Sequence, residues 1–533
     1  MDFIIGHLDM VMFLAAIVLL LRGFPVAFTL AGVGLMFALL GAFFQEGSFT
    51  HRSGDMWRSL RFLQPVFNRI FGLMDETNEV LVAVPLFVFM GVMLERSKVA
   101  GELLETMGKL FGTLRGGLGF SVTFVGMLLA ASTGIVGATV VTMGLISLPS
   151  MLRHNYDRGL ACGSIAAAGT LGQIIPPSIV LIILGDTISN QYIAARRSIG
   201  DFAPTPVSVG DLFVGALIPG LMLVGMYMLY QLALAIFRPS ASPAMEIDVK
   251  VSAAEVLRVL APPILLILAV LGSILYGIAT PTEAASVGGV GAILLAGMRA
   301  GQGSPTPMYL AVVGLFFAFA CTAFFDLRVT RTRIEPRDML GMYLAGAGLL
   351  LVAWGLLNGL WRTARTGILR DVVQSTTKVT CMVFMILIGA QIFNLTFRGL
   401  GGEQTVHELL SNIPGGAFGA MLAVMLVMFI LGFFLDFLEI VFVIVPIMAP
   451  TLFILGLDPI WVAIMMAMNL QTSFLTPPFG FALFYLRGVA PPEITTMEIY
   501  KGVVPFVIIQ LIALGVLAMF PALATWLPGV VFG

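Results

Sequence analysis

Residues 169–178 read GTLGQIIPPS and residues 469–478 read NLQTSFLTPP, and each stretch places a pair of prolines inside a long apolar segment. Proline lacks a backbone N–H and its ring clashes with the preceding turn, so each pair should interrupt a helix. Inside a bilayer, carbonyl groups freed by such a break are tolerated only where protein covers them or where they line a polar cavity. Two interrupted helices at matching places in two halves of a chain are typical of secondary transporters.

The composition predicts a polytopic α-helical membrane protein. Of 533 residues, 59% are hydrophobic and 11% charged, and the mean hydropathy is +1.02; repeated apolar runs are long enough to span a bilayer. The net charge of −1 comes without a basic block, so nucleic acid is not an expected partner. Three isolated cysteines and four dispersed histidines predict neither a disulfide framework nor a metal cluster. The N-terminus has no basic region or cleavage site, which favours a retained first helix over a removed signal.

An internal repeat organises the chain. The second proline pair lies 301 residues after the first, and the same shift maps Pro149 onto Pro450 and Asp157 onto Asp458. Residues 118–150 are too long for one span and carry Ser-Thr-Gly at 132–134, which predicts a helical hairpin; residues 433–457 are interpreted likewise, with Pro446 and Pro450 as breakers. The expected fold is therefore all-α, with two repeats, inverted as in other such folds, each containing a hairpin and a broken helix.

These features predict the following organisation along the chain: N-terminal scaffold and arm helices (1–116), a first transport repeat (117–205), scaffold helices (206–300), an inserted helix pair (301–365), a scaffold helix of the second half (366–413), a second transport repeat (414–490) and a C-terminal helix (491–533).

The broken helices are candidate cation sites. A hard cation such as Na⁺ prefers oxygen ligands, which unwound carbonyls and Ser or Thr hydroxyls supply. In the first half we expect carbonyls of Gly172, Ile175 and Pro176 with Ser132 or Thr133 of the hairpin; in the second half the shifted positions are Ser473, Thr476 and Phe479, with Gly432 on the hairpin side. Polar residues in the same stretches, expected along the path of substrate or ion, are Gln173, Ser178, Asn469 and Gln471. The competing interpretation is a pair of ordinary kinked helices.

Asp436 and Glu439 lie three residues apart, so both face one side of a helix. Carboxylates inside a membrane are costly and usually serve a cavity or an ion path. The alternative is that they cap a helix at a hairpin tip. For Glu283 in Thr-Pro-Thr-Glu (280–283), the capping box is the preferred interpretation. Residues 45–78, in which Arg69 and other arginines alternate with aromatic residues, fit either an interfacial helix or a solvated loop.

At these motifs the chain resembles the large membrane subunit (DctM-type permease) of tripartite ATP-independent periplasmic (TRAP) transporters. The stretches that carry the resemblance cover nearly the whole chain and are GFPVAF (23–28), VPLF (84–87), STGIVGA (132–138), GQIIPPS (172–178), GIATPTEAA (277–285) and TPPFG (476–480).

The resemblance implies a bacterial inner-membrane importer that works with a small four-helix membrane subunit and a periplasmic binding protein. It further implies coupling to a sodium gradient without ATP, no organic cofactor, and an elevator in which hairpins and broken helices move against a scaffold. A small organic acid or related polar solute is the implied substrate. The family's first sodium site falls on Thr133, Val136, Gly172, Ile175 and Pro176, and its second falls on Gly432, Ser473, Thr476 and Phe479. Two departures stand out: one hydroxyl is missing from the first hairpin tip, and Ser473 stands where glycine is common.

Two other functions compete with this one. A sodium-coupled carboxylate or anion carrier that works alone would share the hairpins and proline breaks. An intramembrane aspartyl protease would use Asp157 and Asp436, but Asp157 lies in a polar turn and no Gly-x-Gly-Asp accompanies Asp436. An enzyme is therefore not expected.

Overall fold

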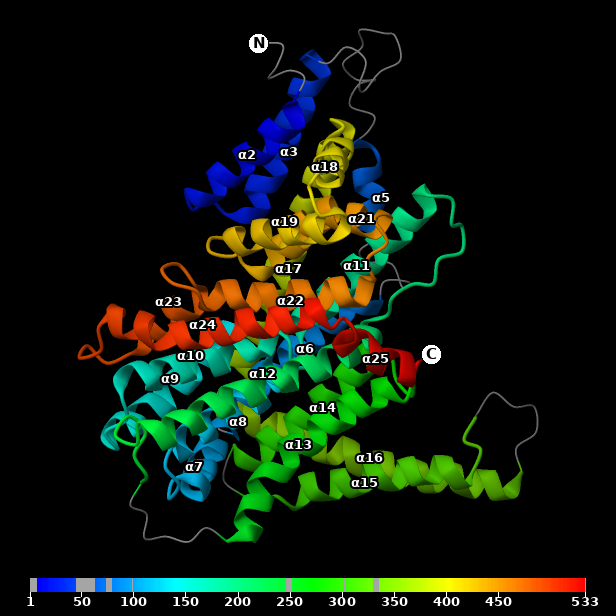
Figure 1. The fold of residues 1–533 in the computed structure, drawn as a ribbon. Coiled ribbons are helices and arrows are strands. Elements are labelled where there is room, and N and C mark those ends of the chain that lie inside the picture. The colour runs from blue at the N-terminus through cyan, green and yellow to red at the C-terminus, as the bar shows by residue number, and fades with distance from the viewer. Residues whose placement is uncertain are drawn as a thin grey trace.

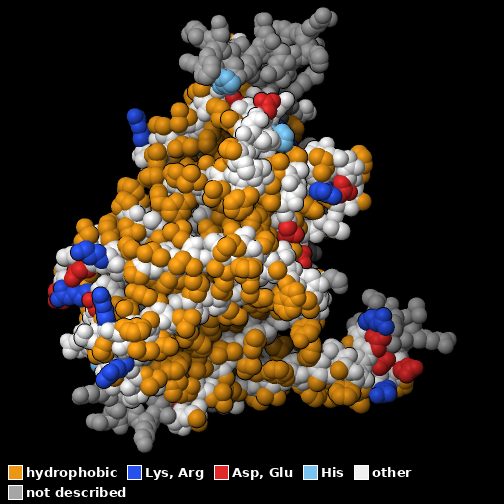
Figure 2. Space-filling view, in the orientation of Figure 1, with side chains coloured by type: hydrophobic (Ala, Val, Ile, Leu, Met, Phe, Trp, Pro, Cys, Tyr) orange, Lys and Arg blue, Asp and Glu red, His pale blue; other side chains and the backbone are white. Residues whose placement is uncertain are grey.

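The computed structural model describes residues 7–44, 63–72, 79–97, 99–245, 252–300, 303–328 and 335–532. The described residues form helices joined by short turns, with no strand among them, as expected from the sequence. Nine of these helices are long and apolar enough to cross a membrane. Figure 2 shows hydrophobic side chains over the middle of one face, with charged groups gathered at its margins, which is the distribution that a bilayer requires.

The helices fall into consecutive groups along the chain (Figure 1). The N-terminal group is α2 (Leu8–Leu21), α3 (Val26–Phe44), α5 (Pro65–Gly72), α6 (Glu79–Arg96) and α7 (Val99–Phe111). The first repeat is α8 (Gly117–Thr133), α9 (Val136–Arg153), α10 (Arg158–Thr170), the 3₁₀ turn η2 (Leu171–Gln173) and α11 (Ile179–Ser198). The middle helices are α12 (Val209–Phe237), α13 (Ala253–Leu275), α14 (Pro281–Arg299), α15 (Thr306–Phe324), α16 (Pro336–Arg365), α17 (Ile368–Gly399) and α18 (Gly402–Ser411).

The second repeat is α19 (Gly416–Leu431), α20 (Phe437–Glu439), the π-helical turn η3 (Ile440–Ile444), α21 (Val445–Ile454), α22 (Pro459–Leu475) and α23 (Phe481–Val489); α24 (Thr496–Met519) and α25 (Ala522–Val531) follow. The first hairpin, α8–α9, has the extent that the sequence predicts. The second was placed wrongly. Its first arm is α19 and its second arm runs from Phe437 to Ile454, so residues 433–457 form only the turn and one arm. Neither Pro446 nor Pro450 breaks this arm. The π-helical turn η3 precedes Pro446, and Asn394 Nδ2 donates to Phe442 O, the carbonyl that Pro446 leaves without its helical donor.

The same helix cap begins both broken helices. Asp157 Oδ1 accepts a hydrogen bond from Leu160 N at 2.8 Å at the start of α10, and Asp458 Oδ1 accepts from Trp461 N at 2.9 Å at the start of α22. An N-cap aspartate fixes the residue at which a helix begins. The two caps and their partners are each separated by the 301 residues of the sequence repeat.

The turn before each cap is also repeated. Asn155 (φ 57°) and Gly456 (φ 88°) both adopt the left-handed conformation that ends a helix. After each of them the next N–H bonds back to the last helical turn, Tyr156 N to Met151 O and Leu457 N to Leu452 O, both at 3.1 Å. Every residue of the second bond lies 301 positions after its counterpart in the first, which supports two related halves.

The two broken helices run in opposite directions. The start of α10 lies beside the segment that follows the second broken helix, where Arg158 Nη1 donates to Glu493 O at 3.1 Å. The later part of α11 lies beside the start of the other broken helix, where the ring of Tyr192 packs edge-on against Phe453 at 5.5 Å. An antiparallel pair of broken helices is the arrangement that inverted repeats would have. Helices α22 and α24 lie between the hairpins in Figure 1.

The inserted helices α15 and α16 pack on each other through glycines. A Cβ added to Gly314 would lie 2.5 Å from Gly348 O, and one added to Gly297 of α14 would lie 2.7 Å from Gly359 Cα of α16. Small residues allow such close backbone contact between membrane helices. The pair extends away from the rest of the protein in Figure 1 and ends in charged residues in Figure 2.

The capping box expected at residues 280–283 is confirmed: Thr280 N donates to Glu283 Oε2 at 2.8 Å, and Glu283 N donates back to Thr280 Oγ1 at 3.3 Å. Of the stretch 45–78, the described helix is α5, which turns Phe67 and Phe71 outward with 78% of each side chain exposed. Two exposed aromatic rings on a short amphipathic helix favour the interfacial interpretation for this part; residues 45–62 and 73–78 lie outside the described residues.

Candidate functional site

The first broken helix is open over residues 174–178. In a continuous α-helix, Gly172 O and Gln173 O would accept hydrogen bonds from the fourth residue ahead, but Pro176 and Pro177 have no N–H to donate. Ser178 Oγ replaces one of these donors by bonding to Gln173 O at 3.0 Å. Gly172, a sequence-predicted ligand, is therefore a residue whose carbonyl has lost its helical donor.

The tip of the first hairpin lies against both sides of this break. Gly134 ends α8 in the left-handed conformation (φ 60°), and a Cβ added there would lie 3.1 Å from Ile179 N, at the start of α11. A Cβ added to Gly172 would lie 3.4 Å from Ala130 O of α8. Val136, another expected ligand, is the first residue of α9 and is buried. The side chains of Ser132 and Thr133 lie outside the described part of the chain.

Helix α12 covers the first break from another direction. A Cβ added to Gly220 would lie 2.8 Å from Ile175 Cδ1 and 3.7 Å from Ile174 O. Ile175 and Pro176, both expected ligands, are buried. The unwound backbone at residues 174–178 is therefore covered by protein, as backbone at bilayer depth must be.

The second break occupies residues 476–480 and repeats the same chemistry. Pro477 and Pro478 remove the helical donors for Ser473 O and Phe474 O. Ser473 O accepts instead from Thr476 N at 3.1 Å, a tighter turn than the α-helix makes. Thr476 Oγ1 donates to Thr472 O at 2.7 Å, which leaves the oxygen lone pairs of this hydroxyl free to meet a cation.

The tip of the second hairpin lies on the second break. A Cβ added to Gly432 would lie 2.8 Å from Ser473 Cβ and closer still to Ser473 Oγ, so only glycine fits this approach. The ring of Phe434 at the tip lies 5.2 Å from the ring of Phe479 in the break, centroid to centroid. The second set of sequence-predicted ligands (Gly432, Ser473, Thr476 and Phe479) is thus assembled around one tip and one break.

Polar side chains join the two broken helices where they cross. Gln471 Nε2 lies 3.5 Å from Thr170 Oγ1, and these two residues are themselves 301 positions apart. Nearby, Gln510 Nε2 of α24 donates to Tyr227 Oη of α12 at 2.7 Å. All four side chains are fully buried. Buried polar groups that are hydrogen-bonded to each other hold helices in one relative position.

The remaining polar residues of the two stretches have distinct positions. Asn469 Nδ2 donates to Met425 O at 2.8 Å and so ties α22 to the first arm of the second hairpin. Gln173 is fully buried, and neither polar atom of its side chain has a partner among the described residues. An unsatisfied buried amide costs about 1–3 kcal/mol, so a ligand or an ordered water is expected beside it.

Asp436 and Glu439 form a capping box at the second hairpin tip. Asp436 Oδ1 accepts from Phe437 N at 2.8 Å, and Glu439 Oε2 accepts from Asp436 N at 3.2 Å. The geometry is the capping alternative that the sequence left open. A place for these carboxylates on an ion or substrate path stays a prediction.

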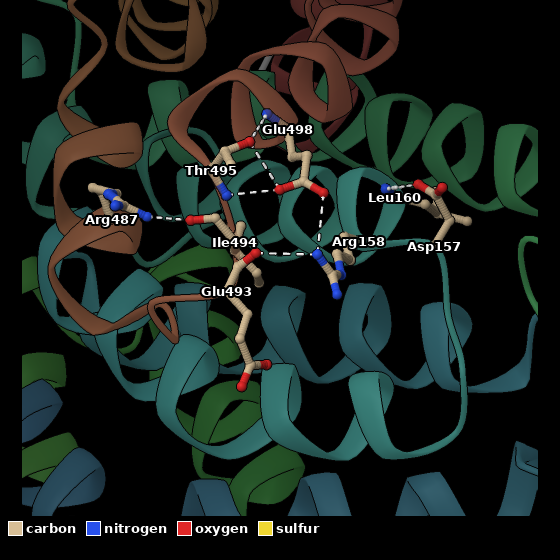
Figure 3. A network of polar contacts seen from close by, with 8 residues as sticks. All are labelled: Asp157, Arg158, Leu160, Arg487, Glu493, Ile494, Thr495 and Glu498. Atoms are coloured by element: carbon tan, nitrogen blue, oxygen red, sulfur yellow. Dashed lines mark hydrogen bonds and ion pairs between the residues drawn. The ribbon is translucent and has the colours of Figure 1, made fainter.

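A polar network fastens the segment between α23 and α24 to the start of the first broken helix (Figure 3). Arg158 Nη1 lies 3.6 Å from Glu498 Oε1 in addition to its bond to Glu493 O, and Arg487 donates to Ile494 O. Glu498 in turn caps α24 through Thr495. The protease hypothesis finds no support here, since Asp157 and Asp436 are each engaged in capping a different helix.

Carbonyls without their helical donors and the Thr476 hydroxyl are the kind of oxygen ligand that a hard cation prefers. The described residues contain no group of three His, Cys, Asp or Glu side chains that could hold a transition metal. Tyr227 and Gln510 were not predicted from the sequence. A signal existed for Gln510, because a lone amide in the apolar segment 503–519 is costly unless it has a partner.

The chain is similar to known membrane proteins along nearly its whole length. The family model described as "Tripartite ATP-independent periplasmic transporter, DctM component" matches residues 13–523. The C4-dicarboxylate TRAP transporter large permease protein DctM of Vibrio cholerae is 27% identical over 98% of both chains. The ectoine TRAP transporter large permease protein TeaC of Halomonas elongata is 24% identical over 96% of this chain and 97% of its own. The sialic acid TRAP transporter large permease protein SiaM of V. cholerae is 24% identical over 97% of both chains.

A solved structure shares the fold. The YdaH transporter of Alcanivorax borkumensis aligns with a TM-score of 0.56 and 14% identity, covering 96% of this chain and 98% of its own. The family model spans nearly the whole chain, including both hairpins and both breaks. The chain therefore belongs to the DctM family, the large membrane subunits of tripartite ATP-independent periplasmic transporters.

Proposed function

We propose that this protein imports a small organic acid or related polar solute by coupling it to the inward movement of sodium ions. Family membership gives the broader statement: the chain is a multi-pass protein of the bacterial inner membrane and a secondary importer rather than an enzyme. As the large subunit of a tripartite system, it works with a small membrane subunit and a periplasmic binding protein, which removes the stand-alone carrier as an alternative.

The observation that carries the sodium proposal is the pairing of each hairpin tip with a break in its own half. Gly172 and Ser473, which are equivalent in the repeat, lose their helical donors to proline, and each lies under a hairpin tip. Carbonyl oxygens left in this way at a protected site are suited to sodium. We assign one cation to each half, held by the residues that the family resemblance implies.

Binding of an anionic substrate follows from the same breaks. Helix α11 begins at Ile179 and α23 begins at Phe481, so the N-terminus of each second half-helix faces its break. Free N–H groups and the helix dipole favour negative charge at such ends. The relatives' names mention C4-dicarboxylates, ectoine and sialic acid. The helix ends favour an anion and two of these three names mention acids, so an organic acid is the substrate class that we propose.

For the elevator movement, we propose a mobile body larger than the two sequence-defined repeats. Its core is residues 117–205 and 414–490, and packing argues for adding α12 and α24. Gln231 of α12 donates to Thr123 of α8 at 2.7 Å. A Cβ added to Gly163 of α10 would lie 2.6 Å from the backbone of α24 at Gly502. Helices in such close contact move together, against a static remainder that includes α3, α6 and α17.

The test is uptake into proteoliposomes that contain both membrane subunits, with the cognate binding protein outside. Candidate solutes are those that stabilise the binding protein against thermal unfolding. The proposal predicts accumulation that requires an inward sodium gradient and stops when potassium replaces sodium. Equal uptake in both salts would refute the coupling.

A further inference from the structure

A polar cavity of about 450 Å³ lies away from the two breaks. Its walls are α5, α11, α17, α18 and the second arm of the second hairpin. The polar residues that matter here are Arg69, Asp186, Asn190, Asn394, Arg398 and Glu403. The volume falls in the range that holds a small organic ligand, and one wall belongs to the proposed mobile body while the other belongs to the scaffold.

Arg69 brings to this cavity a positive charge that has no ion-pair partner among the described residues. While Phe67 and Phe71 of the same short helix turn outward, Arg69 is half-buried and Nη1 donates to Gln391 Oε1 of α17 at 3.3 Å. Among the described residues, no carboxylate lies within ion-pair distance of Arg69. Burial, and then the positive charge of Arg398, lower the pKa of Arg69, whereas Glu403 raises it.

Two other charges of the cavity pair with each other. Arg398 Nη2 lies 2.5 Å from Glu403 Oε1, so these two largely cancel. Asp186, on the α11 wall, bonds to Asn190, a neutral amide that leaves its negative charge uncompensated. A half-buried guanidinium with no ion-pair partner among the described residues favours an anion, and the planar guanidinium suits a carboxylate.

An acceptor accompanies this cation. The Asp186 carboxylate lines the cavity from α11. Asn394 ties the α17 wall to the second hairpin, since its Nδ2 donates to Phe442 O, in the π-helical turn η3, at 3.0 Å. A solute that fits Arg69 and Asp186 has a carboxylate at one end and hydroxyl or ammonium donors elsewhere.

We propose that this cavity is a vestibular binding site for a hydroxy- or amino-substituted carboxylic acid, with Arg69 binding the carboxylate before the solute reaches the hairpin tips. The assignment rests on the proposed import of organic acids. It differs from the sites at the breaks because it uses a side-chain cation at the boundary between the mobile body and the scaffold.

The first experiment measures the charge of the cavity without knowledge of the substrate. Ala194→Cys introduces a thiol at an exposed lining position of α11, and Cys381→Ser removes the exposed native thiol; Cys162 and Cys321 are buried. The complex of both membrane subunits, in nanodiscs of neutral lipid, reacts with an anionic (sulfonatoethyl) and a cationic (trimethylammonioethyl) methanethiosulfonate.

One unit charge lost at a distance of about 10 Å should lower the anionic-to-cationic rate ratio by about tenfold. We expect this for Arg69→Gln and a near wild-type ratio for Arg69→Lys. Arg365→Gln is the matched control, because Arg365 stacks on Trp361 outside the cavity. An Arg69→Gln ratio equal to that of the control would overturn the proposal.

The second arm tests the ligand. Malate, gluconate and glutamate are the probes, and the diamide of malate is the neutral control. At least one acid should slow labelling by the anionic reagent, with protection lost in Arg69→Gln, retained in Arg69→Lys and absent with the diamide. Protection by none of the three acids contradicts a solute site. In nanodiscs of phosphatidylglycerol, loss of both the Arg69-dependent rate ratio and the protection by acids would assign the cavity to a lipid headgroup instead.

These outcomes separate the vestibular site from the proposed function. Sodium-independent uptake would refute the coupling and leave the labelling ratios unchanged. Conversely, sodium-driven uptake with Arg69→Gln labelling like the control would retain the transporter and remove this site.

Discussion

The contact between Gly432 and Ser473 is the part of the second cation site that a single methyl group disturbs most. The Cβ of Gly432→Ala would lie 2.8 Å from Ser473 Cβ, where ordinary contact begins at 3.4 Å. The hairpin tip must therefore move away from the break by about half an ångström or more. Since ligands on both sides are needed to hold an ion, the substitution should weaken sodium binding more than it weakens the fold.

The magnitude follows from the cost of overpacking. Extra atoms in a well-packed site cost about 1–3 kcal/mol, and if the closed, sodium-bound arrangement bears this cost, sodium affinity falls by about 5- to 150-fold. The assay is the thermal unfolding midpoint of the purified subunit complex against sodium concentration, with potassium keeping the ionic strength constant. A ligand that binds the folded state stabilises it by an amount set by its dissociation constant, so the curve reports affinity without a known substrate.

A second substitution makes the reasoning specific. Ser473→Gly removes both atoms that collide with the new methyl group and keeps the backbone carbonyl, so Gly432→Ala with Ser473→Gly should recover most of the sodium affinity. Gly225→Ala is the matched control, because an added Cβ there meets nothing within 4 Å. A sodium curve unchanged in Gly432→Ala, or unchanged by the compensating substitution, would refute the assigned site.

The remaining predictions concern Thr476, whose hydroxyl is a proposed cation ligand, and the contact between α10 and α24 in the proposed mobile body. Thr476→Ala should raise the sodium concentration needed for half-maximal stabilisation, and Thr476→Ser, which keeps the hydroxyl bonded to Thr472 O, should not; equal curves for the two variants would remove this ligand. Gly502→Ala should lower the free energy of unfolding by about 1–3 kcal/mol, because its Cβ would lie 2.8 Å from Gly159 Cα and closer still to Gly159 O. Denaturant titration measures this against Gly515→Ala, where nothing lies within 4 Å, and equal stabilities would contradict the packing.

The sequence predicted the parts of the fold that depend on local chemistry. Both helices break where proline removes donors, and the first hairpin turns at Gly134, whose left-handed backbone a β-carbon would disfavour. The repeat offset also paired Asp157 with Asp458, and the structure shows that both are helix caps. Each of these features is set within a few residues, so its pattern is visible in the chain itself.

Features that depend on contacts between distant segments could not be predicted. The second hairpin was misplaced because its first arm resembles an ordinary span. The sequence assigned Gly432 and Ser473 to one site, but only packing shows how closely the two residues approach each other. Arg69 was assigned to a polar stretch, but its role depends on Gln391, 322 residues later. Asp436 and Glu439 have a spacing that fits both a cavity and a capping box, and the extended backbone of Asp436 decides for the box.

Equilibrium binding of ²²Na⁺ to the purified complex of both membrane subunits tests the central assignment most directly, since it counts cations without requiring transport. We predict two saturable sites, of which Gly432→Ala weakens one by about 5- to 150-fold while Gly225→Ala weakens neither. The absence of saturable sodium binding, or two affinities that Gly432→Ala leaves unchanged, would contradict the assignment of a cation to each hairpin tip and broken helix.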